Sequence, residues 1–452
     1  MKKMTQELDN NAVETMMAAG AYDMTPEKMA SQAEWLANEL GETIPSVQDK
    51  EEQFFRSELE TRRLPNREDA LRYLLFRQTH DVYQNMYMTP QDGVTVVGVG
   101  HKEAPLFFRA RTSVADATDY AIEQASYSNG LLLVHPQEGH MAVHPLMWTA
   151  FDDLCAISGL GCKTMRRVTP IMNGKTEKIG VLSPDERGAI FTKGLRLQKT
   201  DMFRVLIRDG MIARIGSRLW RELDAVQGVR ETEEFLENEF PGYTYMDGWC
   251  AEDILVMEYN TNADLTDLAV NLRNVGIDLK KDPVLVYRFS TGETGLSAMK
   301  LVPVLYINDT PVTIPNAPRL DHTVSSAKKS FHDLIQKTGG FYRELEDSVE
   351  ILGNTPVKYP DGCLWSILCG DEKVVSGISR KIARDAADTL SGKNDASAID
   401  VYLAILDACG KQAGANTSAF SISAYIGLTE AASGLLFSPM LFKTHDEPIP
   451  QK

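Results

Sequence analysis

Two Asp-Gly pairs set between strand-like runs constrain the fold of this chain more than any other feature. Asp209-Gly210 lies between residues 203–208 and 211–215, and Asp247-Gly248 lies between residues 243–246 and 249–259. The flanking runs are rich in aliphatic, β-branched and aromatic residues, which favour strands. Because Asp-Gly is a preferred pair in the two-residue turn of a β-hairpin, the sequence predicts two hairpins in the middle of the chain.

A third pair of apolar runs, residues 284–289 and 296–307, flanks a glycine-rich loop at 290–295. Asn308-Asp309 then turns the chain toward residues 312–314. The loop is followed by no Gly-Lys-Ser/Thr sequence, so we interpret it as a hairpin connection rather than a phosphate-binding loop. These runs together predict a twisted, mostly antiparallel sheet.

Helical patterns occupy both ends of the chain. Near the N-terminus, Thr25 and Asn66 have the character of N-cap residues. Further helices are expected at 113–129, 146–158, 231–239, 325–337, 341–352, 371–389, 397–409 and 417–436. The sequence therefore predicts an α+β fold in three regions: a helical N-terminal region (1–90), a sheet core (91–320) and a helical C-terminal region (321–452) with a short mobile tail.

Composition excludes secreted and membrane classes. The N-terminus has no apolar segment of the kind found in signal peptides. The longest apolar runs, such as 131–134 and 301–307, fall far short of the roughly 20 residues that cross a bilayer. The six cysteines form no CxxC pair, which is typical of reduced thiols. We therefore expect a cytoplasmic protein with no membrane partner.

The net charge of −16 conceals a basic region between two acidic ones. Residues 1–60 hold 13 Asp or Glu against 5 Lys or Arg, residues 160–230 hold 15 Lys or Arg against 7 acids, and residues 231–272 hold 11 acids and no Lys or Arg. A basic region attracts nucleic-acid phosphates. The alternative is that its arginines pair within the chain with the acids of 231–272.

The first expected hairpin lies at the centre of the basic region. A two-residue turn would place Arg204 and Arg208 on one sheet face with Met211 and Ala213, and Arg214 on the other face. Arginines and aromatic side chains on a sheet can hold single-stranded nucleic acid. The candidate nucleic-acid-binding residues are Arg204, Arg208, Arg214, Arg218, Tyr243 and Tyr245.

The densest group of possible metal ligands consists of His135, Glu138, His140 and His144. Pro136 and Gly139 interrupt any helix that would align these residues, and the chain contains no HExxH motif. A polar loop leading into the helix at 146–158 is the simpler interpretation. The sequence thus predicts no cofactor and keeps a metal-dependent hydrolase only as a third hypothesis.

Other catalytic signatures are absent from the sequence or incomplete. Gly98-Val-Gly100 follows a β-branched run as a dinucleotide-binding turn does, but position 103 is Glu where the third glycine would stand. A tight exit from the strand is the simpler interpretation of these glycines. No GxSxG nucleophile motif is present. Enzymatic activity is therefore not excluded, but no motif supports it.

Four short segments carry a family resemblance. They are residues 202–217, 289–297 and 320–323, together with Asp400-Val-Tyr402. These segments resemble an uncharacterised phage- and plasmid-associated family, the domain of unknown function 932 group, and its relatives on conjugative elements of Gram-positive bacteria. The resemblance implies a gene carried by a phage or mobile element and expressed in a bacterial cytoplasm. It transfers no catalytic residue.

These observations support two functional hypotheses. The first is a non-enzymatic accessory protein of a phage or mobile element that binds nucleic acid, with single strands favoured. The second is an oligomeric structural or protein-interaction component, which would associate with itself or with a host or phage protein.

Overall fold

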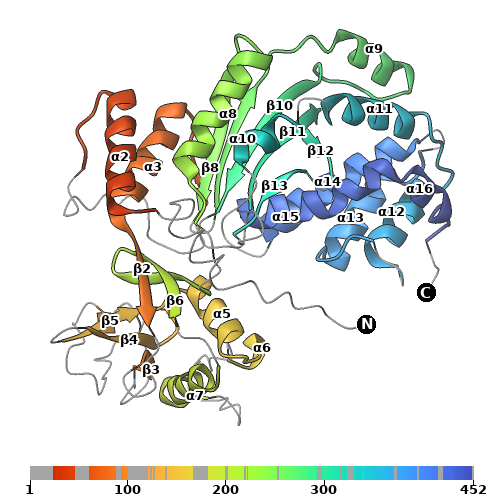
Figure 1. The fold of residues 1–452 in the computed structure, drawn as a ribbon. Helices are drawn as coiled ribbons and strands as arrows, with labels where there is room; N and C mark the ends of the chain where they lie inside the picture. The colour runs from red at the N-terminus through yellow and green to blue at the C-terminus, as the bar shows by residue number, and fades with distance from the viewer. Residues whose placement is uncertain are drawn as a thin grey trace, which may run out of the picture.

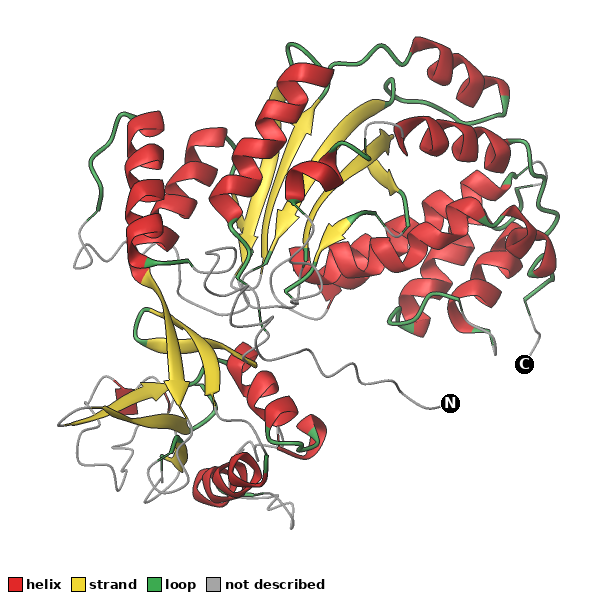
Figure 2. Cartoon of the chain, in the orientation of Figure 1, coloured by secondary structure: helices red, strands yellow, loops and turns green. Residues whose placement is uncertain are grey.

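The computed structural model describes residues 24–45, 61–87, 93–99, 121–122, 125, 128–137, 140–165, 182–198, 202–217, 220, 222–251, 254–292, 298–315, 317–322, 330–338, 341–370, 374–393, 396–415 and 421–449. In these residues the chain forms two lobes (Figure 1). The large lobe combines a sheet with most of the helices, and the small lobe combines two short sheets with fewer helices (Figure 2).

The large lobe is assembled from two separate stretches of chain. Its first described helices are α2 (Pro26–Leu40) and α3 (Arg67–His80), capped by Thr25 and Asn66 as expected. Their buried residues, such as Leu36 and Leu71, belong to one hydrophobic core with residues between 223 and 442. The described residues between 81 and 220 form the small lobe as an insertion, whereas the sequence predicted three consecutive regions.

The sheet of the large lobe is antiparallel throughout. Its strands follow the order β1-β8-β9-β10-β11-β12, and β13 also pairs with β11. They are β1 (Arg62–Arg63), β8 (Thr244–Ala251), β9 (Ile254–Asn260), β10 (Val284–Thr291), β11 (Met299–Ile307), β12 (Thr310–Thr313) and β13 (Arg319–Leu320). This sheet with its covering helices confirms the predicted α+β class and the strand pair on either side of residues 290–295.

The second Asp-Gly pair does not form a hairpin turn, and that prediction is wrong. Asp247 and Gly248 lie inside β8, which runs on to Ala251. A side chain at Gly248 would come within 2.8 Å of the Val256 carbonyl oxygen on the neighbouring strand. Glycine is therefore needed at this position for close packing of strands rather than for a turn.

Helices cover both faces of the large sheet (Figure 1). On one face, α8 (Ala225–Glu239) packs so closely that Gly228 faces Phe289 and Met299. On the opposite face, Ile422 and Ile426 of α15 (Ile422–Ser433) contact Val256. The remaining helices of this lobe are α9 (Thr266–Asn274), α10 (Phe331–Ile335), α11 (Phe341–Gly353), α12 (Pro360–Cys369), α13 (Arg380–Leu390), α14 (Ala398–Ala415), the 3-10 helix η2 (Gly434–Phe437) and α16 (Pro439–Thr444).

The C-terminal helices differ from expectation in two places. The helix expected at 371–389 begins only at Arg380, because Gly377 adopts a φ of 96° and Ser379 caps α13, and α12 was not predicted. The tail expected to be mobile lies against α12 up to residue 449. There the Asp446 carboxylate accepts hydrogen bonds from the backbone N–H groups of Lys358 and Tyr359 at 2.8 and 2.5 Å.

The small lobe contains two three-stranded antiparallel sheets. One has the order β2-β6-β7, with β2 (Asp81–Tyr87), β6 (Met202–Arg208) and β7 (Met211–Ser217). The other has the order β3-β4-β5, with β3 (Thr95–Gly98), β4 (Leu131–Gln137) and β5 (His140–Pro145). Helices α5 (Trp148–Ile157), α6 (Cys162–Met165) and α7 (Pro184–Leu197) complete the lobe.

Three predictions for the small lobe can be compared with the structure. Asp209 and Gly210 form the turn between β6 and β7, with φ values of 50° and 79°, which confirms the first hairpin. The expected polar loop after residue 134 is instead the hairpin of β4 and β5. A side chain on Gly98 would clash with the backbone of Asp185, so this glycine allows α7 to pack on β3. Most of the helix expected at 113–129 lies outside the described residues.

Within the described residues, no helix combines the length and the apolar character needed to cross a membrane.

Candidate nucleic-acid interface

A β-bulge determines where the three hairpin arginines point. The pairing between β6 and β7 shifts by one residue between Leu206 and Ile207, so Arg214 lies opposite Leu206 and Gly216 lies opposite Arg204. Residues that face each other across two strands share a sheet face. Arg214 is therefore on the same face as Arg204 and Arg208, and its predicted place on the opposite face is wrong because a hairpin without a bulge was assumed.

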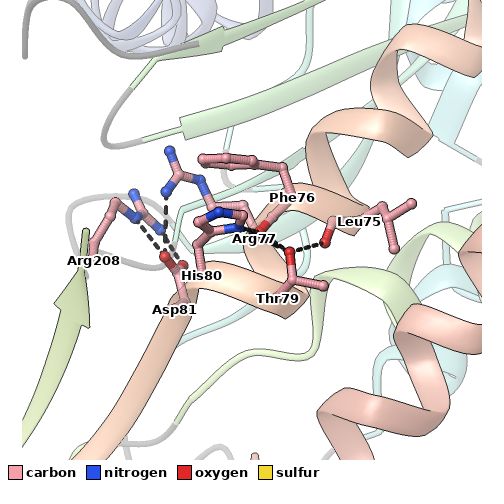
Figure 3. Close-up of polar contacts among 7 residues, drawn as sticks. All are labelled: Leu75, Phe76, Arg77, Thr79, His80, Asp81 and Arg208. Atoms are coloured by element: carbon pink, nitrogen blue, oxygen red, sulfur yellow. Dashed lines mark hydrogen bonds and ion pairs between the residues drawn. The ribbon is translucent and has the colours of Figure 1, made fainter. Parts of the chain in front are cut away.

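Arg208 is paired with Asp81 at the junction between the lobes (Figure 3). Asp81 is both the C-cap of α3 and the first residue of β2. Its carboxylate accepts hydrogen bonds from Nε and Nη2 of Arg208 at 3.0 and 2.7 Å, and from Nη1 of Arg77 at 3.2 Å. All three side chains are at most 2% exposed. One carboxylate thus joins a helix of the large lobe to two strands of the small lobe.

Arg204 takes part in a second buried ion pair close to the junction. Its Nη2 lies 2.7 Å from Oε1 of Glu222, whose side chain is fully buried. The other oxygen of Glu222 accepts a hydrogen bond from the backbone N–H of Met24 at 3.0 Å. The pair therefore ties β6 to the segment before α8 and to the residue that precedes the Thr25 cap of α2.

Arg214 is paired with Asp153 of α5 and lies over the ring of Trp220. The second carboxylate oxygen of Asp153 accepts a hydrogen bond from the backbone N–H of Ile215 at 3.0 Å. Burial raises the pKa of Asp153 to about 6, although the charge of Arg214 acts in the opposite direction. This carboxylate and guanidinium join α5 to the edge of β7.

The guanidinium groups of the hairpin are thus matched by carboxylates of the same chain. Pairing within the chain was one of the two expected alternatives, but the partner acids are Asp81, Asp153 and Glu222, all outside residues 231–272. Acids of that stretch pair with other arginines: Glu233 with Arg67, Asp247 with Arg63 and Glu258 with Arg288. Arg218 lies outside the described residues.

Tyr243 and Tyr245 do not form an open stacking platform. Their rings pack edge-on against the buried ring of Tyr259, with centroids 5.8 and 5.7 Å away. The hydroxyl of Tyr245 donates to the carbonyl of Leu64 at 2.8 Å. Burial raises the pKa of both phenols. These tyrosines fasten β8 to the core of the large lobe.

The candidate metal ligands are only partly described. The register of β4 and β5 pairs His135 with Ala142 and Leu133 with His144, so His135 and His144 share a face of the hairpin. Burial lowers the pKa of both histidines, and the proximity of His144 lowers that of His135 further. Glu138 and the side chain of His140 lie outside the described residues. Where side chains are described, no group of three or more His, Cys, Asp or Glu is arranged to hold a metal.

The exposed cations at the start of α13 are a feature that the sequence reasoning missed. Arg380, Lys381 and Arg384 are exposed, and the first turn of this helix contains no acid. The N-terminus of a helix carries a partial positive charge, so acids are usual there and cations are unfavourable. The sequence signal for this feature is Ser379 followed by Arg380-Lys381. An N-cap residue is usually followed by acids, but here it is followed by two cations.

Packing holds this turn firmly in place. The inner face of α13 buries Ala383, Ala386 and Ala387, whose small side chains allow close contact with neighbouring helices. The backbone N–H of Ser379 donates to Oε1 of the buried Gln412 on α14 at 2.8 Å. The cations are therefore presented from a fixed helix rather than from a loop.

Two other helix ends provide a comparison. At the N-terminus of α12, the chain itself supplies an anion, the carboxylate of Asp446. At the C-terminal end of α7, Lys193 and Arg196 are exposed and have no ion pair in the described part of the chain, but there the helix dipole favours cations. Among these three helix ends, only the N-terminus of α13 combines exposed cations with the positive end of a helix dipole.

The charges at the start of α13 therefore indicate the kind of ligand that would bind there. A fixed turn with two exposed cations at a helix N-terminus favours an anion with several phosphates. No relative narrows this chemistry further. No protein-family model matches the chain, and neither does any curated protein or any solved structure.

Proposed function

We propose that this chain is a non-enzymatic accessory protein that binds nucleic acid through the first turn of α13. The observation that carries the proposal is the pair of exposed cations, Arg380 and Lys381, at a helix N-terminus that no acid of its first turn neutralises. Backbone N–H groups at such an end and flanking cations are common partners of phosphate oxygens. The family resemblance favours a role on a phage or mobile element.

The proposal places the interface away from the hairpin arginines. Arg204 and Arg208 are 7% and 1% exposed, and each would have to leave a buried carboxylate before it could reach a phosphate. Breaking a buried ion pair costs about 3–5 kcal/mol, more than a phosphate contact at the surface returns. Arg380 and Lys381 need no such rearrangement.

Fluorescence anisotropy with a labelled oligonucleotide, as a single strand and as a duplex, tests the proposal between 50 and 200 mM salt. We expect affinity that falls steeply with salt, because each neutralised phosphate releases counterions. The double variant R380A/K381A should bind about tenfold more weakly and should lower the logarithmic salt slope by about 1.5. Comparison of the affinities for the two oligonucleotides shows whether the protein prefers single-stranded or double-stranded nucleic acid.

The matched control is K193A/R196A on α7, which removes the same two residue types from an exposed helix. Its affinity should stay within about twofold of the unmodified protein, because contacts to phosphate are local. Undetectable binding at the lowest salt contradicts the proposal. An equal loss in both double variants also contradicts it, since it indicates attraction to overall charge.

A second candidate function is protein interaction, including self-association. Phe437 at the end of η2 and Met440 in α16 are large apolar residues that are 40% and 63% exposed. Exposed apolar residues close together are typical of interaction surfaces. Light scattering should then show an oligomer that F437S/M440S dissociates, and a monomer at micromolar concentration would contradict self-association.

A further inference from the structure

The hairpin of β4 and β5 brings two histidines together on one face. The register pairs Leu133 with His144 and His135 with Ala142, so His135 and His144 occupy diagonal positions across the two strands. Diagonal neighbours on a sheet are about 7–8 Å apart, which long side chains can bridge.

His144 is held in the orientation that metal-binding histidines adopt. Its Nδ1 lies 3.0 Å from the carbonyl oxygen of Gly210 in the turn of the neighbouring hairpin. A carbonyl oxygen only accepts, so Nδ1 carries the ring proton and Nε2 retains a lone pair. Metal-binding histidines usually donate their second ring N–H to a carbonyl or carboxylate in this way.

His135 is buried and has an unsatisfied ring nitrogen. The residue is 9% exposed, and its Nδ1 is buried without a hydrogen-bond partner. A buried polar atom without a partner costs about 1–3 kcal/mol, so such an atom usually has a bound water or ion as its partner. The unsatisfied nitrogen is independent of the strand register and of the His144 contact, and it also indicates a ligand.

We propose that His135 and His144 bind one divalent transition-metal ion, of which zinc is the reference case. Neutral imidazole is a preferred ligand of such ions, and two protein ligands leave positions for further donors. The backbone of His140 pairs with Gln137 in the same hairpin, so this residue is within the same short segment. The ion would fasten β4 to β5, and its binding does not depend on the proposed nucleic-acid interface.

The test uses full-length protein without a polyhistidine tag. Calorimetric titration with zinc chloride should show one equivalent bound at micromolar concentration. Titration with cobalt(II) should produce the intense visible absorption of a low-symmetry site built from protein ligands. His135→Gln and His144→Gln should each weaken zinc binding by about 100-fold or more, since even loss of an outer-shell partner weakens metal affinity 10–100-fold. His332→Gln, an exposed histidine on α10, is the matched control and should bind zinc normally.

Thermal unfolding separates loss of the site from loss of the fold. Zinc should raise the melting temperature of the unmodified protein and of His332→Gln, but not that of His144→Gln, whose far-ultraviolet circular dichroism should stay native. The proposal is overturned if the unmodified protein binds no zinc at micromolar concentration. It is also overturned if both glutamine variants bind zinc as tightly as the unmodified protein.

Discussion

The hairpin of β6 and β7 contains three arginines and the first turn of α13 contains two cations, but the environments of these two sets of charges are opposite. Arg204, Arg208 and Arg214 face a covered sheet surface and are paired with carboxylates. Arg380 and Lys381 face outward from a helix end that contains no acid. A count of charges in a short stretch of sequence therefore does not predict whether its cations are buried in ion pairs or exposed to a ligand, because the partner acids come from distant parts of the chain.

The difference also assigns a different role to each set of charges. The hairpin cations hold elements together. Arg208 joins the two lobes at their junction, Arg204 joins β6 to the segment before α8, and Arg214 joins β7 to α5. The α13 cations hold nothing together in the described structure except for the exposed pair of Arg384 with Asp388. Changes at the hairpin should therefore affect stability, and changes at α13 should affect binding.

The largest expected effect is at Asp81. Substitution Asp81→Ala removes the carboxylate that two buried guanidinium groups share, so the free energy of unfolding should fall by about 3–5 kcal/mol. Urea unfolding followed by circular dichroism measures the loss. The same substitution at exposed Asp388 should change stability by no more than about 0.5 kcal/mol. A loss below about 1 kcal/mol at Asp81 would remove the distinction between the two regions.

A smaller effect is expected from the pH dependence of Asp153. Burial raises its pKa in the folded protein to about 6, above the ordinary 3.8. Between these values the folded protein holds a proton that the unfolded chain has released, so stability from this group is present below about pH 4 and is lost as pH rises through 6. Stability relative to Asp153→Asn should therefore decline by about 3 kcal/mol across this window. If the free energies of unfolding of the two proteins change in parallel between about pH 4 and 6, Asp153 does not titrate in this range.

The smallest expected effect has the opposite sign and occurs at α13. Arg380→Glu places an acid at the positive end of the helix, so it should raise the free energy of unfolding by about 0.5 kcal/mol while weakening nucleic-acid binding. Arg196→Glu, at the C-terminal end of α7, should lower stability by a similar amount. Urea unfolding of the two variants in parallel measures both signs. Equal shifts in the same direction would indicate that helix dipoles do not control these positions.

Local signals in the sequence predicted much of the fold. Thr25 and Asn66 cap the helices that follow them, and Asp209-Gly210 forms its hairpin turn, because these preferences depend on neighbouring residues alone. The same reasoning failed at Asp247-Gly248, where the close approach of another strand requires the glycine. That contact joins residues from different strands, so it cannot be predicted from a short window of sequence.

The candidate sites were less predictable than the fold. One extra residue at the β-bulge places Arg214 on the face opposite to the expected one, and no turn or composition signal announces the bulge. The carboxylates that neutralise the hairpin come from positions 81, 153 and 222, which are up to 127 residues away from their partners. By contrast, the mismatch between the Ser379 cap and the cations after it was readable from the sequence.

The insertion of the small lobe has a consequence for synthesis of the protein. Residues 24–80 leave the ribosome before residues 81–220, but the core that contains Leu36 and Leu71 is completed only by residues from Leu223 onward. At about 5–20 residues per second, the roughly 140 intervening residues take about 7–30 s to make. During that interval the two early helices expose their apolar sides, while the small lobe, which has its own core, can fold first. The apolar faces of α2 and α3 thus have to wait for partners that are synthesised about 140 residues later.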